Sequence, residues 1–269
     1  MNDVIGVILA GGTGSRLRPL TLSTNKHLLH VDGLPMICYP LECLREAGLK
    51  HICIVTGHEY AGGFGELLGS GERYDVQLSF AYQEKAAGIA DALAKVEWMA
   101  KGKNVAVILG DNIFEDTLVI KRALEGFTKG ARIILSEVPE DKLYEQGFDK
   151  QPRAKYGIAQ VDGEKVVSIV EKPSKPAQSN LAVTGAYVYD EHVFDIVKKL
   201  VPSKRGELEI TDVNNAYREK GLLTALRVNG WWGDAGENID ALHHAAELLR
   251  ASPKTRAEYR RILTVKNHR

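Results

Sequence analysis

The feature that most constrains the fold is an apolar run that leads straight into a glycine-rich loop. Val4–Leu9 contains no polar side chain, and Gly11, Gly12 and Gly14 follow it. An apolar run of this length predicts a strand buried on both faces, as in parallel sheets covered by helices. Glycines just after such a strand let the backbone approach a ligand closely. The chain therefore begins like an α/β protein with a ligand loop at the carboxyl end of a strand.

The first half of the chain continues this alternation of apolar runs and amphipathic patterns. Strands are predicted at His51–Thr56, Asp75–Ala81 and Asn104–Leu109, and helices at Pro35–Ala47 and Gly88–Ala100. Strands joined through helices lie parallel and are connected by right-handed crossovers. Because ligands gather at the carboxyl ends of such strands, we expect the loops after Leu9 and Leu109 to lie at the ligand-binding edge.

The second half is predicted to contain a hairpin, further strands and helices, and one long loop. Tyr156–Val161 and Lys165–Val170 alternate around an Asp-Gly pair, which is a hairpin signal. Strands are also predicted at Ala182–Tyr189 and Leu222–Val228, and helices at Glu191–Leu200, Glu207–Lys220 and Asn238–Ala251. The mixed-charge segment Pro139–Lys155 has no period, so we expect a surface loop there. No linker divides the chain, which predicts a single domain over residues 1–269.

Composition excludes several classes of partner. Lys plus Arg and Asp plus Glu number 35 each, so no overall field attracts nucleic acid or an anionic membrane. No apolar run is long enough to span a membrane, and no secretory signal is evident, which favours the cytoplasm. Cys38, Cys43 and Cys53 lack metal-ligand spacing and are expected to be buried free thiols in a reducing compartment.

The glycine loop belongs to neither of the two commonest phosphate-binding patterns. From Gly12 it runs G-T-G-S-R-L, so the third glycine of a dinucleotide fingerprint is missing, and this excludes a dinucleotide-dependent oxidoreductase. No G-x-x-x-x-G-K-[ST] string occurs. What remains is G-G-x-G-x-R, in which backbone amides and Arg16 can grip phosphate oxygens. The alternative is a glycine-rich turn with a solvated arginine.

Two further residues are candidates for the same phosphates. Lys26 lies shortly after the loop and can bring a second cation to it. Asp111 follows the strand that ends at Leu109, a favoured place for a carboxylate that holds Mg²⁺. Asp111 can equally cap a following helix, and both readings stay open at this point.

Two other strings carry chemistry-bearing side chains near predicted strand ends. Glu171 and Lys172 place an acid beside a base, although a solvated strand end is the simpler reading. Trp231 and Trp232 precede Asp234, which suits a sugar ring beside a carboxylate. A tryptophan packed in the core is the alternative.

Together these motifs resemble the sugar-1-phosphate nucleotidyltransferase family, most closely the short-form glucose-1-phosphate thymidylyltransferases. The matching strings are LAGGTGSRLRPLT (9–21), NKHLL (25–29), LGDNIF (109–114), YG (156–157), VEKP (170–173), AVTGAYVYD (182–190), RGELEITDVN (205–214) and WWGDAG (231–236). They extend through nearly the whole chain. The resemblance implies a Rossmann-like, three-layer α/β/α fold with a mixed, mainly parallel central sheet.

The resemblance also implies a reaction. The family transfers a nucleotidyl group from a nucleoside triphosphate to a sugar 1-phosphate and releases pyrophosphate, with Mg²⁺ as cofactor. For this chain the resemblance implies dTTP and α-D-glucose 1-phosphate as the substrates. UTP or CTP, or another hexose 1-phosphate, are alternatives within the family. A non-catalytic nucleotide-sugar sensor is a different class, and its sign would be loss of Arg16, Lys26 or a metal-binding aspartate. Family members commonly form homo-oligomers, so a dimer or tetramer is expected.

The resemblance assigns roles to individual residues. Nucleotide binding is implied for Leu9, Gly11, Gly12, Gly14, Arg16, Gln83, Gly88 and Asp111, and catalysis for Arg16, Lys26 and Lys172. Sugar-phosphate binding is implied for Asn112, Tyr156, Gly157, Glu171, Lys172, Val183, Arg205 and Trp232, and Mg²⁺ binding for Asp111 and Asp234. By this assignment residues 1–137 bind the nucleotide, 138–237 bind the sugar phosphate and 238–269 form a C-terminal helical segment.

Several positions depart from the commonest family pattern. His30 stands where proline is usual, and Ala235 follows Asp234 where threonine is more usual. Asp91 replaces glutamine or histidine near Gln83 and Gly88, which the resemblance implies read the base. Pro139–Lys155 is longer than is typical, which predicts a lid or an altered sugar preference.

The C-terminal segment also differs from that of the long-form enzymes. Those enzymes carry a further helical region that helps build a regulatory nucleotide site, so we expect reduced feedback at such a site here. The basic residues Lys254, Arg256, Arg260, Arg261, Lys266 and Arg269 are predicted to form a solvated terminal helix.

Overall fold

A single sheet runs through the molecule. The computed structural model describes residues 4–146 and 150–264. Within these residues nine strands form one sheet. In order across the sheet they are β11 (Ile158–Asp162), β12 (Lys165–Val170), β14 (Leu223–Arg227), β8 (Ala131–Glu137), β13 (Leu181–Tyr189), β6 (Asn104–Leu109), β1 (Val4–Ala10), β4 (His51–Thr56) and β5 (Gln77–Tyr82).

The sheet is mixed, and its parallel part matches the predicted strand–helix alternation. β6, β1, β4 and β5 all run parallel, and Leu9 lies opposite both Leu109 and Val55. β13 is antiparallel to β6 and to β8, whereas β14 is parallel to β8. The carboxyl ends of β1 and β6 therefore meet, as predicted, at one edge of the sheet.

Helices and short strand pairs complete the fold. The helices are α1 (Cys38–Glu46), α2 (Ala61–Leu68), α3 (Ile89–Ala94), α4 (Glu97–Ala100), α5 (Val119–Leu124), α6 (Glu140–Leu143), α7 (Val193–Val197), α8 (Ile210–Glu219), α9 (Ile239–Ala251) and α10 (Pro253–Arg260), with 3₁₀ turns at Ser15–Leu17, Lys26–Leu28, Glu72–Tyr74 and Arg261–Leu263. The short pairs are β2 (His30–Val31) with β3 (Leu34–Pro35), β7 (Asn112–Phe114) with β15 (Trp232–Asp234), and β9 (Tyr144–Gln146) with β10 (Pro152–Ala154).

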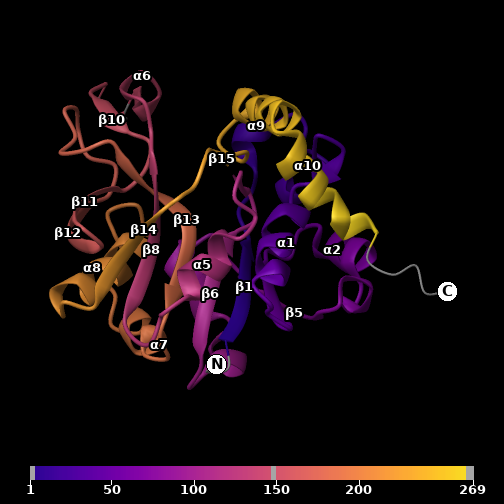
Figure 1. Cartoon of the computed structure of the whole chain (residues 1–269), viewed down its shortest axis with the longest axis horizontal. Coiled ribbons are helices and arrows are strands. Elements are labelled where there is room, and N and C mark those ends of the chain that lie inside the picture. The colour runs from indigo at the N-terminus through magenta and orange to yellow at the C-terminus, as the bar shows by residue number, and fades with distance from the viewer. Residues whose placement is uncertain (1–3, 147–149, 265–269) are drawn as a thin grey trace.

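The sheet separates two hydrophobic cores. Along β1, Ile8 packs into one core while Val7 and Leu9 pack into the other, because successive side chains of a strand point to opposite faces. The first core is covered by α1, α2, α5, α9 and α10, and the second by α3, α4, α7 and α8. Figure 1 shows α9 and α10 crossing the molecule on the side of α1 and α2. The predicted three-layer α/β/α fold is confirmed.

Two predicted helices begin later than expected because their first residues bond elsewhere. The helix predicted from Pro35 begins at Cys38, since β3 occupies Leu34–Pro35 in a hairpin with β2. The helix predicted from Glu207 begins at Ile210. Leu208 is instead hydrogen-bonded through its backbone to Ala87 and Ala90.

Two other helices are shorter than predicted. The helix predicted over Gly88–Ala100 is interrupted at Val96, which leaves α3 and α4, and the helix predicted over Glu191–Leu200 is reduced to α7. Both α3 and α7 end in a hydrogen bond between residues three apart, which tightens the last turn. After α3 the N–H of Lys95 donates to the carbonyl of Ala92, and after α7 the N–H of Lys199 donates to that of Ile196.

The prediction of a loop over Pro139–Lys155 is wrong for most of that segment. It holds α6 and the β9–β10 pair, although 147–149 lie outside the described residues. Leu143 and Ala154 are buried against Ile158 and Ala182 of the main sheet. These few apolar side chains anchor a polar segment whose sequence has no regular period.

The sequence prediction also missed β8, a strand in the interior of the sheet, together with α2, α5 and α10. β8 has only three consecutive large apolar residues, Ile133–Leu135, between charged ones. Its place is decided by its neighbours, because it bonds β13 on one side and β14 on the other. Among the described residues no helix is long and apolar enough to cross a membrane.

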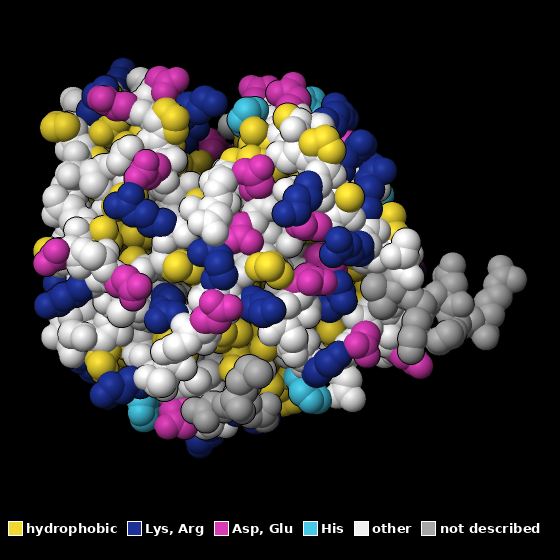
Figure 2. Space-filling view, viewed as in Figure 1, with side chains coloured by type: hydrophobic (Ala, Val, Ile, Leu, Met, Phe, Trp, Pro, Cys, Tyr) yellow, Lys and Arg dark blue, Asp and Glu magenta, His cyan; other side chains and the backbone are white. Residues whose placement is uncertain are grey.

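The basic C-terminal segment is docked on the molecule, so the prediction of a solvated helix is wrong for α10. Arg250, Arg256 and Arg260 all form ion pairs with Asp32, whose side chain is only 5% exposed. Tyr259 is buried against α1. Figure 2 shows Lys and Arg side chains gathered over α10. Of the predicted tail, Lys254, Arg256, Arg260 and Arg261 are described, whereas Lys266 and Arg269 lie outside the described residues.

Candidate functional site

The carboxyl ends of β1, β5 and β6 open into a cleft of about 370 Å³. The predicted site residues that line it are Leu9, Gly11, Gly12, Arg16, Lys26, Gln83, Gly88, Asp111, Asn112, Tyr156, Gly157, Glu171, Lys172, Val183, Arg205, Trp232 and Asp234. Gly14 is the predicted residue that does not line the cleft. Residues far apart in sequence thus meet in one place, while their individual roles stay predictions.

The loop after β1 presents backbone and one arginine to the cleft. Gly12 and Gly14 have φ values of 93° and 60°, which glycine adopts without strain. The hydroxyl of Thr21 donates to the Gly14 carbonyl at 2.8 Å and ties the loop back on itself. Arg16 is exposed and has no ion pair with another described residue. We call residues 9–16 with Gln83 and Gly88 the glycine-loop side of the cleft.

Two aspartates and a lysine meet at the centre of the cleft. β7 pairs with β15 so that Asp234 lies opposite Asn112, and the N–H of Ala235 donates to the carbonyl of Asp111 at 2.9 Å. Asp111 forms an ion pair with Lys26. The alternative in which Asp111 caps a helix is wrong, because the chain continues from it into strand β7.

The pKa values of these groups show how the charges balance. Burial and the neighbouring Asp111 raise the pKa of Asp234 well above its ordinary value. Burial would also raise the pKa of Asp111, but Lys26, His27 and Asn112 together outweigh it and lower that pKa. Burial would lower the pKa of Lys26, yet the two carboxylates raise it. The neighbouring His27 is buried, and burial with the charge of Lys26 lowers its pKa to about 3.

The two aspartates fit a divalent cation. They place two interacting carboxyl groups beside a single lysine, which leaves negative charge that a bound cation would relieve. Carboxylate oxygens are also the ligands that Mg²⁺ prefers. Within the described residues no cluster of three or more His, Cys, Asp and Glu side chains forms a metal site by itself. A cation held here would therefore draw its other ligands from substrate or water.

The base-reading candidates lie on the glycine-loop side. Gln83 follows β5 and is 7% exposed, and its side-chain nitrogen donates to the carbonyl of Gly88 at 3.0 Å and to Asp91 at 2.9 Å. Asp91 also forms an ion pair with Lys95 at 3.1 Å. The departure from the family pattern at Asp91 thus contacts a predicted nucleotide-binding residue directly.

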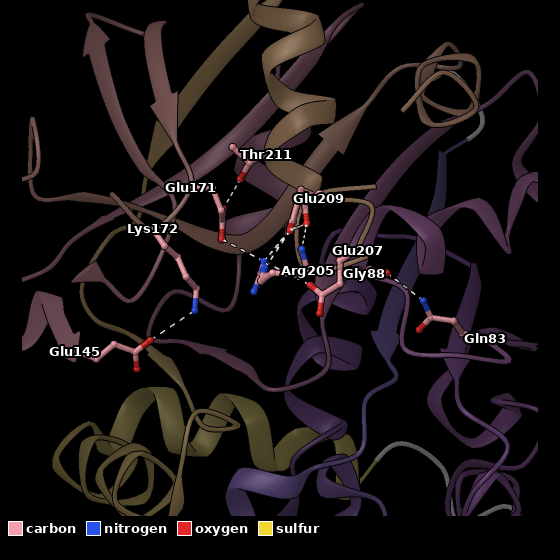
Figure 3. A network of polar contacts seen from close by, with 10 residues as sticks. Gln83, Gly88, Glu145, Glu171, Lys172, Arg205, Glu207, Glu209 and Thr211 are labelled. Atoms are coloured by element: carbon pink, nitrogen blue, oxygen red, sulfur yellow. Dashed lines mark hydrogen bonds and ion pairs between the residues drawn. The ribbon is translucent and has the colours of Figure 1, made fainter. Parts of the chain in front are cut away.

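The opposite side of the cleft is a network of glutamates and cations, shown in Figure 3. The Nη2 atom of Arg205 lies 2.8 Å from Glu209, 3.4 Å from Glu207 and 4.0 Å from Glu171. Lys172 lies 3.6 Å from Glu145. We call these six residues the glutamate side of the cleft.

Two backbone and side-chain details hold the glutamate side in place. The hydroxyl of Thr211, at the start of α8, donates to Glu171 at 2.6 Å. Lys172 has a φ of 43°, a region that residues with a side chain rarely adopt and that concentrates at functional sites. The strand end at Glu171 and Lys172 is therefore not simply solvated.

Aromatic residues close the cleft between these two sides. The indole nitrogen of Trp232 donates to the Asn112 side chain at 2.6 Å, and the ring of Tyr156 meets that of Trp232 edge-on at 4.9 Å. Tyr156 also donates to Glu237 at 2.9 Å. Both tryptophans pack against the first core, so the core reading holds for each of them, and Trp232 also lines the cleft.

Several cleft residues were missed by sequence reasoning. These are Glu145, Lys155, Glu207, Glu209, Thr211 and Glu237. Glu207, Glu209 and Thr211 stand inside the matched string RGELEITDVN, which is a usable signal. Glu145 offers none, because it reaches the cleft only through the β9–β10 pair.

The three cysteines are all buried and free, as predicted. Burial raises the pKa of each thiol to about 12, so none is a reactive thiolate at neutral pH. They contribute packing only and have no part in the cleft chemistry.

Comparisons with known proteins agree with this geometry. The family model for nucleotidyl transferases matches residues 5–252. The chain is 39% identical to a glucose-1-phosphate thymidylyltransferase of Actinoplanes sp. over 91% of this chain and 78% of that protein. It is 38% identical to the enzyme of the same name from Neisseria meningitidis, over 91% of this chain and 82% of that protein.

Solved structures show the same likeness. A Bacillus anthracis protein provisionally identified as a glucose-1-phosphate thymidylyltransferase, in complex with sucrose, superimposes with a TM-score of 0.81. It shares 42% identity and covers 91% of this chain and 94% of its own. A UDP-glucose pyrophosphorylase complexed with UDP-glucose has a TM-score of 0.77 at 24% identity, which shows the shared fold alone. By the match over residues 5–252 and these relatives, the chain belongs to the nucleotidyl transferase family.

Proposed function

We propose that this protein transfers a thymidylyl group from dTTP to α-D-glucose 1-phosphate, giving dTDP-glucose and pyrophosphate. The observation that carries the proposal is a cleft with cations from two separate parts of the fold. Arg16 and Lys26 come from the loops after β1, and Lys172 and Arg205 from the loops after β12 and before α8. The names of the relatives support dTTP and glucose 1-phosphate as the substrates.

The reaction needs cations on both reactants because two anions must meet. A phosphate oxygen of the sugar phosphate forms a bond to the α-phosphorus, while the bond from that phosphorus to the bridging oxygen breaks. The electrons of the broken bond leave with pyrophosphate. The attacking phosphate is already ionised at neutral pH, so the protein supplies no covalent nucleophile. Positioning and electrostatic stabilisation then account for catalysis.

Residues of this chain divide the work between the two reactants. Arg16 and the loop amides would bind the triphosphate and stabilise the departing pyrophosphate, with Lys26 beside the reacting centre. Lys172 and Arg205 would bind the sugar phosphate, and Trp232 with Tyr156 would cover the sugar ring. The buried position of Lys26 strengthens its interaction with phosphate, because the local dielectric is low.

Asp111 and Asp234 would hold Mg²⁺, in agreement with their proximity and their opposed pKa shifts. Bound Mg²⁺ would neutralise charge on the phosphates during the displacement. The cytoplasmic location and the homo-oligomeric state expected from the sequence stay predictions.

A pyrophosphate-release assay tests this proposal. The purified chain is given dTTP, UTP, CTP, ATP or GTP with a panel of hexose 1-phosphates, with Mg²⁺ or with excess EDTA. We expect the highest kcat/KM for dTTP with α-D-glucose 1-phosphate, and loss of turnover in EDTA that added Mg²⁺ restores. Failure of every pair in the presence of Mg²⁺ would overturn the enzymatic assignment. Undiminished turnover in EDTA would overturn the metal assignment to Asp111 and Asp234.

A further inference from the structure

We propose that Asp91 selects for nucleotides whose base carries an N3–H donor, thymine and uracil, by fixing the orientation of the Gln83 side-chain amide. The inference rests on the proposed function, since it concerns the base of the same nucleoside triphosphate. Asp91 acts in it as a positioning residue, while Gln83 faces the base.

The Gln83 amide is held by two acceptors. Its nitrogen Nε2 lies 3.0 Å from the carbonyl oxygen of Gly88 and 2.9 Å from Oδ2 of Asp91. A primary amide has two N–H groups, and each is used by one of these oxygens. Figure 3 shows the nitrogen of Gln83 turned toward Gly88 and its oxygen turned away.

The partners themselves dictate this orientation. A half-turn of the amide would bring Oε1 against the Gly88 carbonyl and the Asp91 carboxylate, which have no proton to donate. Both hydrogen bonds would be lost and replaced by repulsion between oxygens. Lys95 lies 3.1 Å from Oδ1 of Asp91, so the second carboxylate oxygen is occupied as well and the Asp91 side chain is held on both sides.

The oxygen of the amide is left for a ligand. Gln83, Gly11 and Gly88 line the cleft, and a β carbon added at Gly11 would lie 3.0 Å from Oε1. Glycine at position 11 therefore keeps the space beside this oxygen clear. Among the described residues no donor bonds Oε1, whereas Nε2 has both of its acceptors. The cleft thus contains a hydrogen-bond acceptor, Oε1 of Gln83, whose orientation is fixed by the two hydrogen bonds of Nε2.

An acceptor fixed in this way discriminates between bases. Thymine and uracil carry a proton on N3 and can donate to Oε1, whereas N3 of cytosine is an acceptor and would face another oxygen. A site built to hydrogen-bond one group rejects an analogue that cannot make the bond by about 10⁴-fold or more, while a methyl group changes affinity far less. The arrangement therefore predicts rejection of CTP and tolerance of UTP beside dTTP.

The carboxylate at position 91 is the component that makes the orientation unambiguous. An asparagine there could turn its own amide and offer either an oxygen or an N–H to Gln83. Gly88 alone would then favour the observed orientation, and Gln83 would present N–H to the base part of the time. Asp91→Asn changes one atom and keeps the shape of the side chain, so it isolates this effect.

The test measures kcat/KM for dTTP, UTP and CTP with α-D-glucose 1-phosphate in wild type, Asp91→Asn and Lys95→Gln. We expect a wild-type dTTP to CTP ratio of about 10⁴ or more, and a ratio at least about tenfold smaller in Asp91→Asn. In both variants the dTTP to UTP ratio of kcat/KM should stay within about twofold of the wild-type ratio, because it depends only on the methyl group of thymine. Lys95→Gln, which leaves the Gln83–Asp91 bond in place, should keep the wild-type dTTP to CTP ratio.

Dissociation constants of dTTP and CTP, measured by calorimetry on the same proteins, keep the test decisive if Asp91→Asn turns over slowly. An equal loss of affinity and turnover for all three nucleotides in Asp91→Asn would overturn the positioning role and leave only a structural one. Absence of turnover with every nucleotide in wild type is a different result, since it would overturn the proposed function itself.

Discussion

The two sides of the cleft differ in how their cations are paired. The glycine-loop side presents backbone N–H groups and one arginine that has no ion pair among the described residues, whereas the cations of the glutamate side already form ion pairs with glutamates. Arg16 stands exposed at the end of the glycine loop. Arg205 lies within 4.0 Å of three glutamates, and Lys172 lies 3.6 Å from a fourth. One side can bind a phosphate without losing a contact, while the other must exchange a carboxylate for it.

This difference has an energetic consequence. Burying or displacing ion pairs carries a desolvation cost that offsets much of the attraction to a new anion. Arg205 and Lys172 should therefore contribute less to affinity than their charges suggest, and more to selectivity for a group that displaces the glutamates. Arg16 should contribute close to its full charge. Substitutions on the two sides should therefore differ in size and in which substrate they affect.

The largest effect is expected for Arg16→Ala. Loss of a cation that stabilises the departing pyrophosphate should lower kcat about a hundredfold or more. Steady-state kinetics with dTTP and glucose 1-phosphate measure the effect, and far-UV circular dichroism shows whether the fold is intact. Arg18→Ala is the matched control, because Arg18 is an exposed neighbour outside the cleft lining. A turnover of Arg16→Ala near that of wild type would refute the role of Arg16.

A smaller and more selective effect is expected for Arg205→Ala. Because Arg205 would have to give up glutamate contacts in its proposed role of binding phosphate, its loss should raise KM for glucose 1-phosphate about tenfold, equivalent to about 1.4 kcal/mol. KM for dTTP should change little. Arg218→Ala serves as the control, since Arg218 lies on α8 but outside the cleft lining. Equal increases in both KM values would contradict the division of the cleft into two sides.

The smallest effect is expected for Asp32→Asn, which lies outside both sides of the cleft and tests how the C-terminal helices are docked. Asp32 has a φ of 47° in the β2–β3 turn, and asparagine adopts this region as readily as aspartate. Loss of the bonds from the three arginines should lower the free energy of unfolding by about 1.5 kcal/mol at pH 7. Urea unfolding measures this difference. Asp162→Asn is the control, because Asp162 is exposed at the end of β11, just before the β11–β12 turn.

The effect of Asp32→Asn should depend on pH in a defined direction. Burial would raise the pKa of Asp32, but the hydrogen bonds and charges of Arg256, Arg250 and Arg260 outweigh it and hold this pKa below its ordinary value. Between the folded and unfolded pKa values the unfolded state binds more protons, so this contribution rises with pH. The contribution of Asp32 to the free energy of unfolding should be complete above about pH 4, near the pKa of Asp32 in the unfolded state. It should vanish as the pH falls through the pKa of Asp32 in the folded state. A constant difference between the proteins from pH 7 to pH 3 would contradict the ion-pair explanation.

The sequence predicted the glycine-loop side more completely than the glutamate side. Val4–Leu9 and Asn104–Leu109 form strands wherever they are placed, because apolar runs of this kind need burial on both faces. Arg16 on this side, and Asp111 at the centre of the cleft, follow these strands within a few residues, so their approach to the ligand edge is a local consequence of strand direction. Short separations along the chain leave little freedom in where these side chains lie.

The pairing of Arg205 could not be predicted in the same way. Glu207 and Glu209 are near it in sequence, but Glu171 reaches it from another strand end. The docking of α10 was misjudged for a related reason. The arginines look solvated in the sequence, and only the distant Asp32 turns them into an anchor.

Sequence patterns were enough to predict the α/β class, the glycine-rich loop and the types of residue that line the cleft, because short-range apolar patterns and motif spacing are properties of the local chain. The tertiary structure alone decided where β8 lies, which carboxylates surround Arg205 and which way the Gln83 amide points. Each of these depends on a partner from a distant or separately placed segment. The physical reason is that hydrogen bonds and ion pairs act over a few ångströms, so they exist only once folding has brought their partners together.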